Sequence, residues 1–277
     1  MSNKKLLLID GDLLIYRCGF AVEKNKYLVE SKGGCQPFED AKSAKVWMDA
    51  EGGGVIWNRK EVEPLENALA LVKNVIKDIQ DRYAEWAACR LWLSPSMGNF
   101  REQIATRAKY KGNRDATARP MYLAAIRDYL TEHWGAAVTV GQEADDAIGI
   151  DMSDNPGSVC VSFDKDLLQL PGRHYNWITK EERDVTKKEG AKFFWQQTLS
   201  GDATDNVPGC KGIGPVKAAA LIEDCDSPKA CWDKVLEVYT EVHGAEGPAF
   251  ALETARLVYV RRKNNEIWSP PSGALNG

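Results

Sequence analysis

The sequence has few of the residues that build zinc sites and disulfide frameworks. Its 277 residues include three histidines and seven cysteines, the latter at positions 18, 35, 89, 160, 210, 225 and 231. No two cysteines form a Cys-x-x-Cys pair, and an odd number of scattered cysteines does not suit a disulfide framework. We therefore expect reduced thiols, as in a cytosol, and no zinc site.

Two further absences narrow the class of protein. No apolar run approaches the ~18 residues of a membrane span, and residues 2–5 lead directly into an apolar stretch, so we expect no signal peptide. The formal net charge is −4, so binding of nucleic acid requires a local basic patch. Because 44% of the residues are hydrophobic and 27% are charged, which is ordinary globular composition, we expect a cytoplasmic protein without membrane contact.

Short apolar runs alternate with helical patterns over the first two thirds of the chain. Strands are expected at residues 5–10, 89–93, 137–140, 158–164 and 175–178. Helices are expected at residues 13–20, 65–88, 121–134 and from 144 onwards. Strands and helices that alternate in this way predict an α/β fold, with a mostly parallel sheet and helices on both sides.

Two regions depart from this alternation. Residues 21–64 contain glycine breakers, and we interpret them as an insertion in which residues 27–29 and 55–57 pair as a hairpin. From about residue 190 the chain is expected to be helical to its end, with a loose tail from Ser269.

Acidic residues gather where the predicted strands end. Three carboxylates within residues 143–146, at the head of a helix, repel one another unless a cation lies among them. Because ligands gather at the carboxyl ends of parallel strands, we expect the acids after several strands to meet at one site. Asp202 and Asp205 stand three residues apart, and on one helical turn this spacing would put both carboxylates on the same face. The candidate metal ligands are Asp10, Glu143, Asp145, Asp146, Asp164, Asp166, Asp202 and Asp205.

These ligands suit hard divalent cations. Eight carboxylates without a histidine or cysteine among them favour Mg²⁺, with Mn²⁺ able to substitute, over zinc. Two such ions ~3.5–4 Å apart are the usual apparatus for displacement at phosphorus, where one activates water and the other stabilises the leaving oxygen. A helix cap or a solvated turn explains any one of these acids taken singly, but it does not explain their shared position.

Two further stretches suit contact with a phosphate backbone. From Arg101 to Arg119, six basic residues stand against two acids, a local charge of +4. Within residues 109–114 the basic side chains alternate with an aromatic and small residues, which suits binding to phosphates or stacking on bases, although a solvated helix is the alternative. Residues 208–219 carry three glycines before a helix whose first amides can receive a phosphate; an ordinary tight turn is the alternative. The candidate DNA-binding residues are Arg101, Lys109, Tyr110, Lys111, Arg114, Gly209, Lys211, Gly212, Gly214 and Lys217.

Six motifs occur in a fixed order along the chain. They read Leu-Leu-Ile-Asp-Gly-Asp at 7–12, Tyr-Lys-Gly-Asn-Arg at 110–114, Glu-Ala-Asp-Asp at 143–146, Ser-Phe-Asp-Lys-Asp at 162–166, Gly-Asp-Ala-Thr-Asp-Asn at 201–206 and Gly-Cys-Lys-Gly-Ile-Gly at 209–214. This ordered set resembles the 5′-nuclease family, which comprises phage and bacterial 5′→3′ exonucleases, flap endonucleases and the nuclease domain of bacterial DNA polymerase I. Residues 21–64 and those after about 225 carry no motif of the set.

The resemblance implies a fold and a site. It implies a PIN-like (resolvase-like) nuclease core over residues 1–190, with a helical arch at about 94–119, and a helical DNA-binding region over 191–277 that contains a helix-three-turn-helix at about 200–225. The eight acids would hold the metal ions, and a potassium ion often accompanies the helix-three-turn-helix. The residues implied in catalysis are Asp10, Lys111, Arg114 and Asp146.

The resemblance also implies an activity. It is a magnesium-dependent 5′→3′ exonuclease or flap endonuclease that leaves 5′-phosphates, with DNA replication and repair as its setting. The expected substrates are duplex DNA with a 5′ end, nick or flap, and an RNA–DNA hybrid. A monomer in the cytosol of a bacterium or a phage-infected cell is expected.

One position departs from the family pattern. After the strand that ends at Leu93 the family has an aspartate, and this chain offers Ser94 or Ser96 instead. A hydroxyl is a weaker, uncharged ligand, so a family member that binds branched DNA without cutting it is one alternative. A phosphatase of the haloacid dehalogenase type, with its nucleophile and acid in Asp10 and Asp12, is a second, although Leu14 stands where that class has Thr or Val. A PIN-type ribonuclease is a third.

Overall fold

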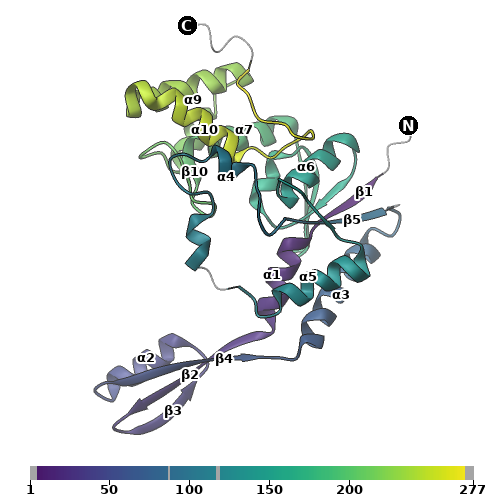
Figure 1. Cartoon of the computed structure of the whole chain (residues 1–277). Coiled ribbons are helices and arrows are strands. Elements are labelled where there is room, and N and C mark those ends of the chain that lie inside the picture. The colour runs from purple at the N-terminus through teal and green to yellow at the C-terminus, as the bar shows by residue number, and fades with distance from the viewer. Residues whose placement is uncertain (1–4, 87, 117–118, 272–277) are drawn as a thin grey trace. The chain divides into compact units, whose positions relative to one another are not determined.

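The computed structural model describes residues 5–86, 88–116 and 119–271 (Figure 1). Contacts within the chain divide it into two compact units. The first unit comprises residues 1–13, 79–118 and 134–277, and the second comprises residues 14–78 and 119–133. No helix within the described ranges is long and apolar enough to cross a membrane.

A six-stranded sheet forms the centre of the first unit. Its strand order is β6 (Ala137–Val138), β5 (Ala88–Leu93), β1 (Leu6–Asp10), β7 (Val159–Val161), β8 (Gly172–Asn176) and β9 (Glu181–Val185). All neighbouring strands pair in parallel except β8 and β9, which confirms the predicted α/β fold with a mostly parallel sheet. The strand β1 lies in the middle and all five of its residues are buried, as its continuous apolar sequence predicts.

Several strands differ from their predicted extents. The strand predicted at 137–140 stops at Val138, because Thr139 turns the chain and its hydroxyl binds the carbonyl of Gln142. The strand predicted at 158–164 stops at Val161, because Asp164 caps the short helix η2 (Lys165–Gln169). The strand β5 is not buried on both faces, since Arg90 and Trp92 bind the carboxylate of Asp151 on one face. Strand β9 was not predicted, since its sequence Glu-Glu-Arg-Asp-Val is highly charged, as suits an exposed edge strand.

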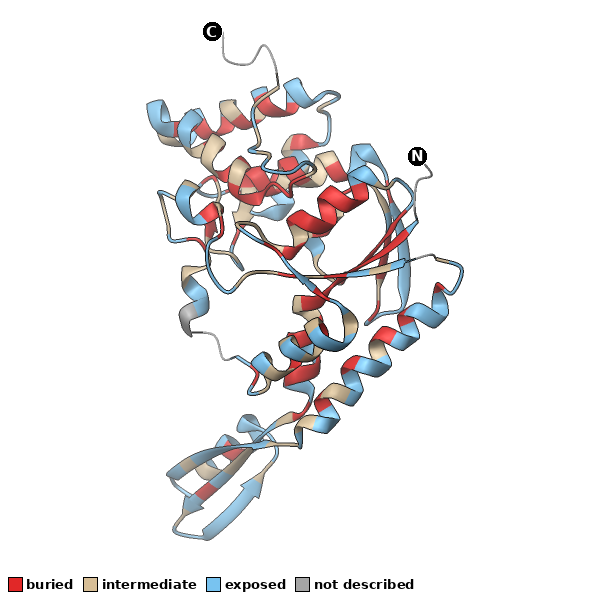
Figure 2. Ribbon diagram, turned by 45° about the vertical axis from the view of Figure 1, so that its right-hand side comes forward, coloured by how far each residue is buried: buried red, intermediate tan, exposed pale blue. Residues whose placement is uncertain are grey.

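Helix α6 (Ala144–Asp154) packs against β1, β5 and β7 and is buried over most of its length (Figure 2). A core cluster joins Leu6 and Leu8 of β1 to Ile148 and Met152 of α6. Val260, which follows the last helix of the chain, belongs to the same cluster. The end of the chain therefore contributes to the core under the sheet.

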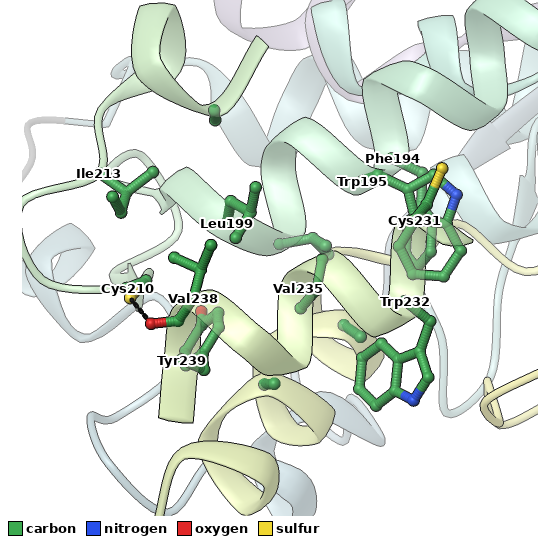
Figure 3. Packing of buried hydrophobic residues seen from close by; sticks show 14 of the residues in the cluster. Phe194, Trp195, Leu199, Cys210, Ile213, Cys231, Trp232, Val235, Val238 and Tyr239 are labelled. Atoms are coloured by element: carbon green, nitrogen blue, oxygen red, sulfur yellow. Dashed lines mark hydrogen bonds between the residues drawn. The ribbon is translucent and has the colours of Figure 1, made fainter. Parts of the chain in front are cut away.

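Four helices form the second core of this unit. They are α7 (Lys187–Ser200), α8 (Pro215–Ile222), α9 (Pro228–His243) and α10 (Gly247–Val258), with the turn η3 (Gly244–Glu246) between the last two. Figure 3 shows how Trp195, Leu199, Trp232 and Val235 pack between them. Trp268 extends this cluster, since its ring centroid lies 5.1 Å from that of Trp232. The aromatic rings thus tie residues beyond α10 to the helices.

The sequence predicted helix from about residue 190 to the end of the chain, and this prediction is wrong in two places. A short hairpin of β10 (Gly201–Asp202) and β11 (Val207–Pro208) follows α7. Residues 259–271 are also without helix, yet 259–261 are buried. Their burial comes from contacts with α6 and the sheet rather than from a helical stripe, so the helical period does not reveal it.

The second unit contains the predicted insertion. Its sheet has the order β3 (Gly34–Phe38), β2 (Glu23–Ser31), β4 (Gly54–Val62) and is antiparallel throughout. The predicted pairing of residues 27–29 with 55–57 is confirmed, with Leu28 opposite Trp57. The two strands do not form a hairpin, because β3 and α2 (Ala41–Ala50), which were not foreseen, lie between them in the chain. The helices α1 (Gly11–Ala21) and α5 (Leu123–Trp134) match their predictions, but α3 (Leu65–Arg82) ends before residue 88 because the chain turns at Tyr83. The first unit also contains α4 (Arg101–Ile104) and η1 (Gly112–Ala116).

Gly149 tests how closely the end of the chain packs on α6. A Cβ at Gly149 would lie 2.3 Å from the carbonyl oxygen of Arg261. Glycine to alanine inside a helix ordinarily stabilises by roughly 0.5–1 kcal/mol. We expect Gly149→Ala instead to lower the free energy of unfolding by about 1–3 kcal/mol, as over-packing does. Urea unfolding would measure it, with the exposed Ser153→Ala of the same helix as control; a stabilised Gly149→Ala would contradict the packing.

Candidate functional site

The strand-end acids of β1 and β7 meet through one serine. Asp10, the last residue of β1, is 3% exposed and accepts a hydrogen bond from Ser162 Oγ at 3.1 Å. Ser162 Oγ in turn accepts from the N–H of Asp164 at 3.0 Å. Asp164 caps η2 by accepting from the N–H of Asp166 at 2.8 Å. Since β1 and β7 are paired strands, these predicted residues do lie together.

The N-terminus of α6 adds two further acids. Glu143 is the N-cap residue and exchanges capping-box hydrogen bonds with Asp146. Asp145 lies in the first turn, where the charges of Asp10 and Asp164 act on it. Adjacent residues of a helix point about 100° apart, because a turn takes 3.6 residues. Asp145 and Asp146 therefore face different surroundings.

Asp202 and Asp205 come from the β10–β11 hairpin instead of a helical turn. Asp202 ends β10, and its Oδ1 accepts a hydrogen bond from the N–H of Thr204 at 2.7 Å. Asp205 lies in the turn between the two strands. The helical spacing argument was therefore wrong for this pair, because Gly201, with φ of 69°, ends α7 and starts the hairpin.

Burial and mutual repulsion raise the pKa values of four of these acids, whereas for Asp202 burial is outweighed by a hydrogen bond with Asp166 and the charge of Lys165, which lower the pKa. Burial, with the charges around it, raises the pKa of Asp10 to about 7. Burial together with Asp10 and Asp164 raises the pKa of Asp145 well above its ordinary value. Burial together with Asp164 and Asp202 raises the pKa of Asp166 to about 8. Shifts in this one direction indicate buried carboxylates with too little positive charge beside them.

Asp202 has the clearest sign of a missing partner. Its residue is 5% exposed, and its Oδ2 is buried without a hydrogen-bond partner. The nearest cation is Lys165 Nζ, 3.6 Å from this oxygen. Asp202 lines a pocket together with Glu143, Asp145 and Asp166. Arg101, Gln197 and apolar side chains also line this pocket. The carboxylate oxygens among its walls, one of them buried without a hydrogen-bond partner, are the ligands that a hard divalent cation prefers.

The side chains do not converge on a metal position as they stand. Within residues 5–86, 88–116 and 119–271, no three histidine, cysteine or acidic side chains are placed to hold one ion. Part of the reason is that basic side chains already neutralise two of the acids. Lys111 forms an ion pair with Glu143, and Arg114 binds Asp205 at 2.6 Å.

Tyr110 and Lys111 connect the basic stretch to the acids. The hydroxyl of Tyr110 lies 2.8 Å from an oxygen of Glu143 and 2.8 Å from one of Asp205, and the ring is buried. The N–H of Lys111 donates to the carbonyl of Asp205 at 2.8 Å, and its φ is 54°. Burial would raise the pKa of Glu143, but Lys111 and Arg101 overcome it and lower that pKa to about 2. Residues 109–114 are thus held against the acids, with only Lys109 and Arg114 among the basic ones largely exposed.

Asp146 and Arg101 form a buried ion pair. Asp146 is fully buried, and its two oxygens accept from Arg101 Nη1 at 2.6 Å and Nη2 at 2.9 Å. The N–H groups of Glu143 and Arg261 also donate to Asp146. The guanidinium of Arg101 also donates hydrogen bonds to the carbonyls of Leu257 and Tyr259. Removing either partner of such a pair costs about 3–5 kcal/mol.

This pair changes the surroundings of two predicted site residues. The carboxylate of Asp146 is occupied by donors from Arg101 and two main-chain groups. Arg101 is 3% exposed, so its guanidinium does not reach a DNA backbone in this conformation. The structure therefore pairs Asp146 with Arg101 below the surface, beside Glu143, whose Oε2 lies 3.5 Å from Arg101 Nη1.

The glycine-rich turn remains on the surface, as the sequence predicts. Lys211, Gly212, Gly214 and Lys217 are exposed. Gly212 has a φ of 79°, which favours glycine. Gly209 lies against the main chain of Ser200, where a Cβ would come within 2.2 Å of the carbonyl carbon, so it fixes the turn to α7. Gly214 is the N-cap of α8 and Pro215 follows it, so the first amides of that helix lie beside the two lysines.

Some residues of the site were not singled out from the sequence. Gln197 of α7 donates to Asp166 at 2.6 Å, and Lys165 lies between Asp166 and Asp202. The position of Lys165 between two aspartates was a usable signal. Gln197 gave none, because it is one polar residue in an amphipathic helix, and neither did Arg261, which reaches Asp146 across 115 residues.

The chain is similar in sequence to several curated nucleases and DNA polymerases. No protein-family model matches it. It is 27% identical to a 5′-3′ exonuclease of Bacillus subtilis over 252 residues, which cover 82% of this chain and 72% of that protein. It is 38% identical over 117 residues to DNA polymerase I of Rhizobium leguminosarum, covering 38% and 11% of the two chains. It is 30% identical over 129 residues to the flap endonuclease Xni of Shewanella baltica, covering 41% and 49%.

The chain thus spans about a tenth and about half of the length of these last two relatives. Among solved structures, its fold resembles the bacteriophage T5 flap endonuclease in a pseudo-enzyme–product complex with DNA and metal ions. The TM-score is 0.63 at 15% identity, covering 92% of this chain and 89% of that one. A zinc-bound T5 5′-exonuclease gives a TM-score of 0.58 at 16% identity, with the same coverage. At these identities the likeness concerns the fold, and it confirms the predicted architecture.

The raised pKa of Asp166 predicts how stability depends on pH without metal. A carboxyl whose pKa rises from 3.8 to about 8 on folding binds its proton more tightly in the folded state. Its contribution to stability is therefore full below about pH 4 and is lost as pH rises through 8. We expect the free energy of unfolding to fall from pH 6 to 9 more steeply in the wild type than in Asp166→Asn, by up to ~1.4 kcal/mol per pH unit.

Chemical denaturation in a chelator at several pH values measures this difference. Groups such as the buried His174 are common to both proteins, so they largely cancel in the comparison. Parallel profiles of the wild type and Asp166→Asn would show that Asp166 is ionised in the metal-free protein.

Proposed function

We propose that this chain, which belongs to the 5′-nuclease family, is a divalent-metal-dependent nuclease that cuts phosphodiester bonds at 5′ ends or flaps of duplex DNA and leaves 5′-phosphates. One observation carries the proposal. Acids gather at the carboxyl ends of β1 and β7, at the N-terminus of α6 and in the β10–β11 hairpin, and two of them, Glu143 and Asp205, form ion pairs with the basic residues Lys111 and Arg114. Hydrolysis of a phosphodiester needs both kinds of charge at one place.

The residues that would hold Mg²⁺, or Mn²⁺ in its place, are the acids with raised pKa values or an oxygen without a partner. They are Asp10, Asp145, Asp164, Asp166 and Asp202. Glu143 and Asp205 join this set when Lys111 and Arg114 leave them. Two bound ions would lower the pKa of water and stabilise the charge on the leaving oxygen. We assign Asp146 a supporting role, because Arg101 occupies it.

Lys111 and Arg114 have a second role in this proposal. Both are cations that now contact acids of the site, so both lie within a side-chain length of the reacting position. In the complex they exchange carboxylate oxygens for phosphate oxygens, where they stabilise the negative charge that develops on the phosphate. Tyr110 keeps the segment attached, because its buried ring belongs to the helical core.

The exposed turn at 209–217 binds the duplex in this proposal. The main-chain amides at the start of α8 receive a phosphate, and Lys211 and Lys217 add positive charge on either side. A potassium ion at this turn, which the family resemblance implies, is part of the same proposal. Because the whole chain carries a charge of −4, binding rests on these local contacts and weakens steeply with salt.

We propose a monomer that acts on DNA ends, nicks and flaps, with RNA–DNA hybrids as further substrates. Its location is the cytosol of a bacterium or of a phage-infected cell.

A family member that binds branched DNA without cutting it is the second candidate. The observation that favours it concerns Ser94, one of the two serines that stand where the family pattern has an aspartate. Its hydroxyl accepts a hydrogen bond from the N–H of Ala144 at 2.9 Å, so it serves the start of α6. Such a protein would protect a flap from other nucleases rather than remove it.

Digestion of end-labelled duplexes tests the proposal. With Mg²⁺ we expect blunt, nicked and 5′-flap substrates to yield products with 5′-phosphates, and a chelator to abolish them. Asp164→Asn should lower turnover on the order of 100-fold, since it removes a proposed metal ligand. Asp154→Asn, an exposed acid at the other end of α6, is the matched control and should cut as the wild type does.

Binding of the flap substrate without any cutting in Mg²⁺ or Mn²⁺ would select the non-catalytic candidate. Cutting by Asp164→Asn at the wild-type rate would show that the metal assignment is wrong.

A further inference from the structure

Asp12 is an acid beside this site that has no role in the description above. It lies in the first turn of α1, two residues after Asp10, and is half-buried. Its Oδ2 accepts a hydrogen bond from the main-chain N–H of Ser94 at 3.0 Å. Since Ser94 directly follows β5, the carboxylate of Asp12 lies at the carboxyl end of that strand.

The end of β5 has no acid of its own. The strand pairs in parallel with β1, with Trp92 opposite Asp10, so the two strand ends are neighbours. The residues that follow it, 94–99, read Ser-Pro-Ser-Met-Gly-Asn and contain no carboxylate. The Ser94 hydroxyl accepts from the N–H of Ala144, which commits it to α6. The carboxylate at this point of the sheet therefore comes from α1.

We propose that Asp12 supplies the carboxylate that the end of β5 lacks, and that it completes a divalent-cation site together with Asp10 and Asp145. This inference rests on the proposed metal dependence and adds to it a ligand that is not among the eight predicted metal acids. Asp12 would act directly on the ion or through a water molecule in its shell, where an added negative charge raises the affinity for a divalent cation.

Three observations support this assignment. Ser94 connects Asp12 to the site, because its N–H donates to Asp12 and its hydroxyl accepts from the N–H of Ala144 in the first turn of α6. Asp10 Oδ1 accepts a hydrogen bond at 3.3 Å from the N–H of Leu13, which follows Asp12 in the first turn of α1, so both acids lie at the N-terminus of this helix. The buried Oδ2 of Asp202 indicates independently that the acidic group lacks a cation.

A purely structural role for Asp12 is the competing explanation. An acid in the first turn of a helix stabilises it by about 0.3–1 kcal/mol, and a hydrogen bond to Ser94 fixes the strand end. Asparagine keeps the oxygen that accepts this hydrogen bond and removes only the charge. Asp12→Asn therefore separates the two explanations.

The experiment titrates the full chain with Mn²⁺ alone, by calorimetry and by thermal shift, without DNA. We expect Asp12→Asn to weaken Mn²⁺ binding about 10–100-fold, while its melting temperature in chelator is unchanged or higher because a repelling charge is gone. Adding Ser94→Asp to Asp12→Asn should restore the affinity, because it returns a carboxylate to the end of β5. Asp154→Asn is the control and should bind as the wild type does.

Wild-type affinity and stoichiometry in Asp12→Asn would overturn the inference and leave the proposed nuclease in place. A weakened affinity that Ser94→Asp does not restore, together with a lower melting temperature in chelator, would assign Asp12 a structural role and also overturn it. Absence of Mn²⁺ binding by the wild type would overturn the metal-dependent function and this inference together.

Discussion

Carboxylates buried side by side need positive charge near them, and the first unit is arranged around this need. Arg101 supplies it to Asp146, while Lys111 and Arg114 supply it to Glu143 and Asp205. Asp10, Asp145, Asp164 and Asp166 have too little positive charge beside them, and so burial and repulsion raise their pKa values. Repulsion among these buried acids lowers the free energy of unfolding, and a bound divalent cation would offset that loss. The stability of the unit is therefore linked to its proposed chemistry.

The supports of this acidic group come from distant parts of the chain. In segment 257–261, the carbonyls of residues 257 and 259 accept hydrogen bonds from Arg101, and the N–H of Arg261 donates to Asp146. Val260 of the same segment packs in the core with β1. Trp268 then joins the aromatic cluster of the helices. The end of the chain, which carries no family motif, therefore fixes both the start of the basic stretch and the N-terminus of α6. Tyr110 couples the helical core to the acids in the same way.

Local sequence was sufficient for the parts of the fold that depend on local chemistry. The run before Asp10 is apolar on both faces, as a central strand requires, and the acidic head of α6 forms the capping box that its residues favour. Asp10 and Asp164, at the ends of paired strands, are accordingly joined through the hydroxyl of Ser162. The separate environments of Asp145 and Asp146 also follow from helical geometry, since neighbours differ by about 100°.

Other parts depended on partners far along the chain. Arg101 is buried against Asp146 and is not exposed to DNA, because it also donates to the carbonyls of residues 257 and 259. No sequence pattern links Arg101 to residues so far along the chain. Tyr110 alternates with lysines like a surface residue, yet the helical core encloses it. The edge strand β9 and the hairpin at Asp202 are charged or very short, so neither carries a period of two. The metal-site and domain assignments stay predictions.

The central claim is that Lys111 holds a place among the acids that a divalent cation would take. Calorimetric titration of Lys111→Gln with Mg²⁺, compared with the wild type, tests this claim most directly. Removing the competing charge should tighten Mg²⁺ binding, even as the loss of a phosphate contact lowers the rate of DNA cleavage. Unchanged or weaker Mg²⁺ binding by Lys111→Gln would contradict the account, since the lysine would then not occupy a cation position.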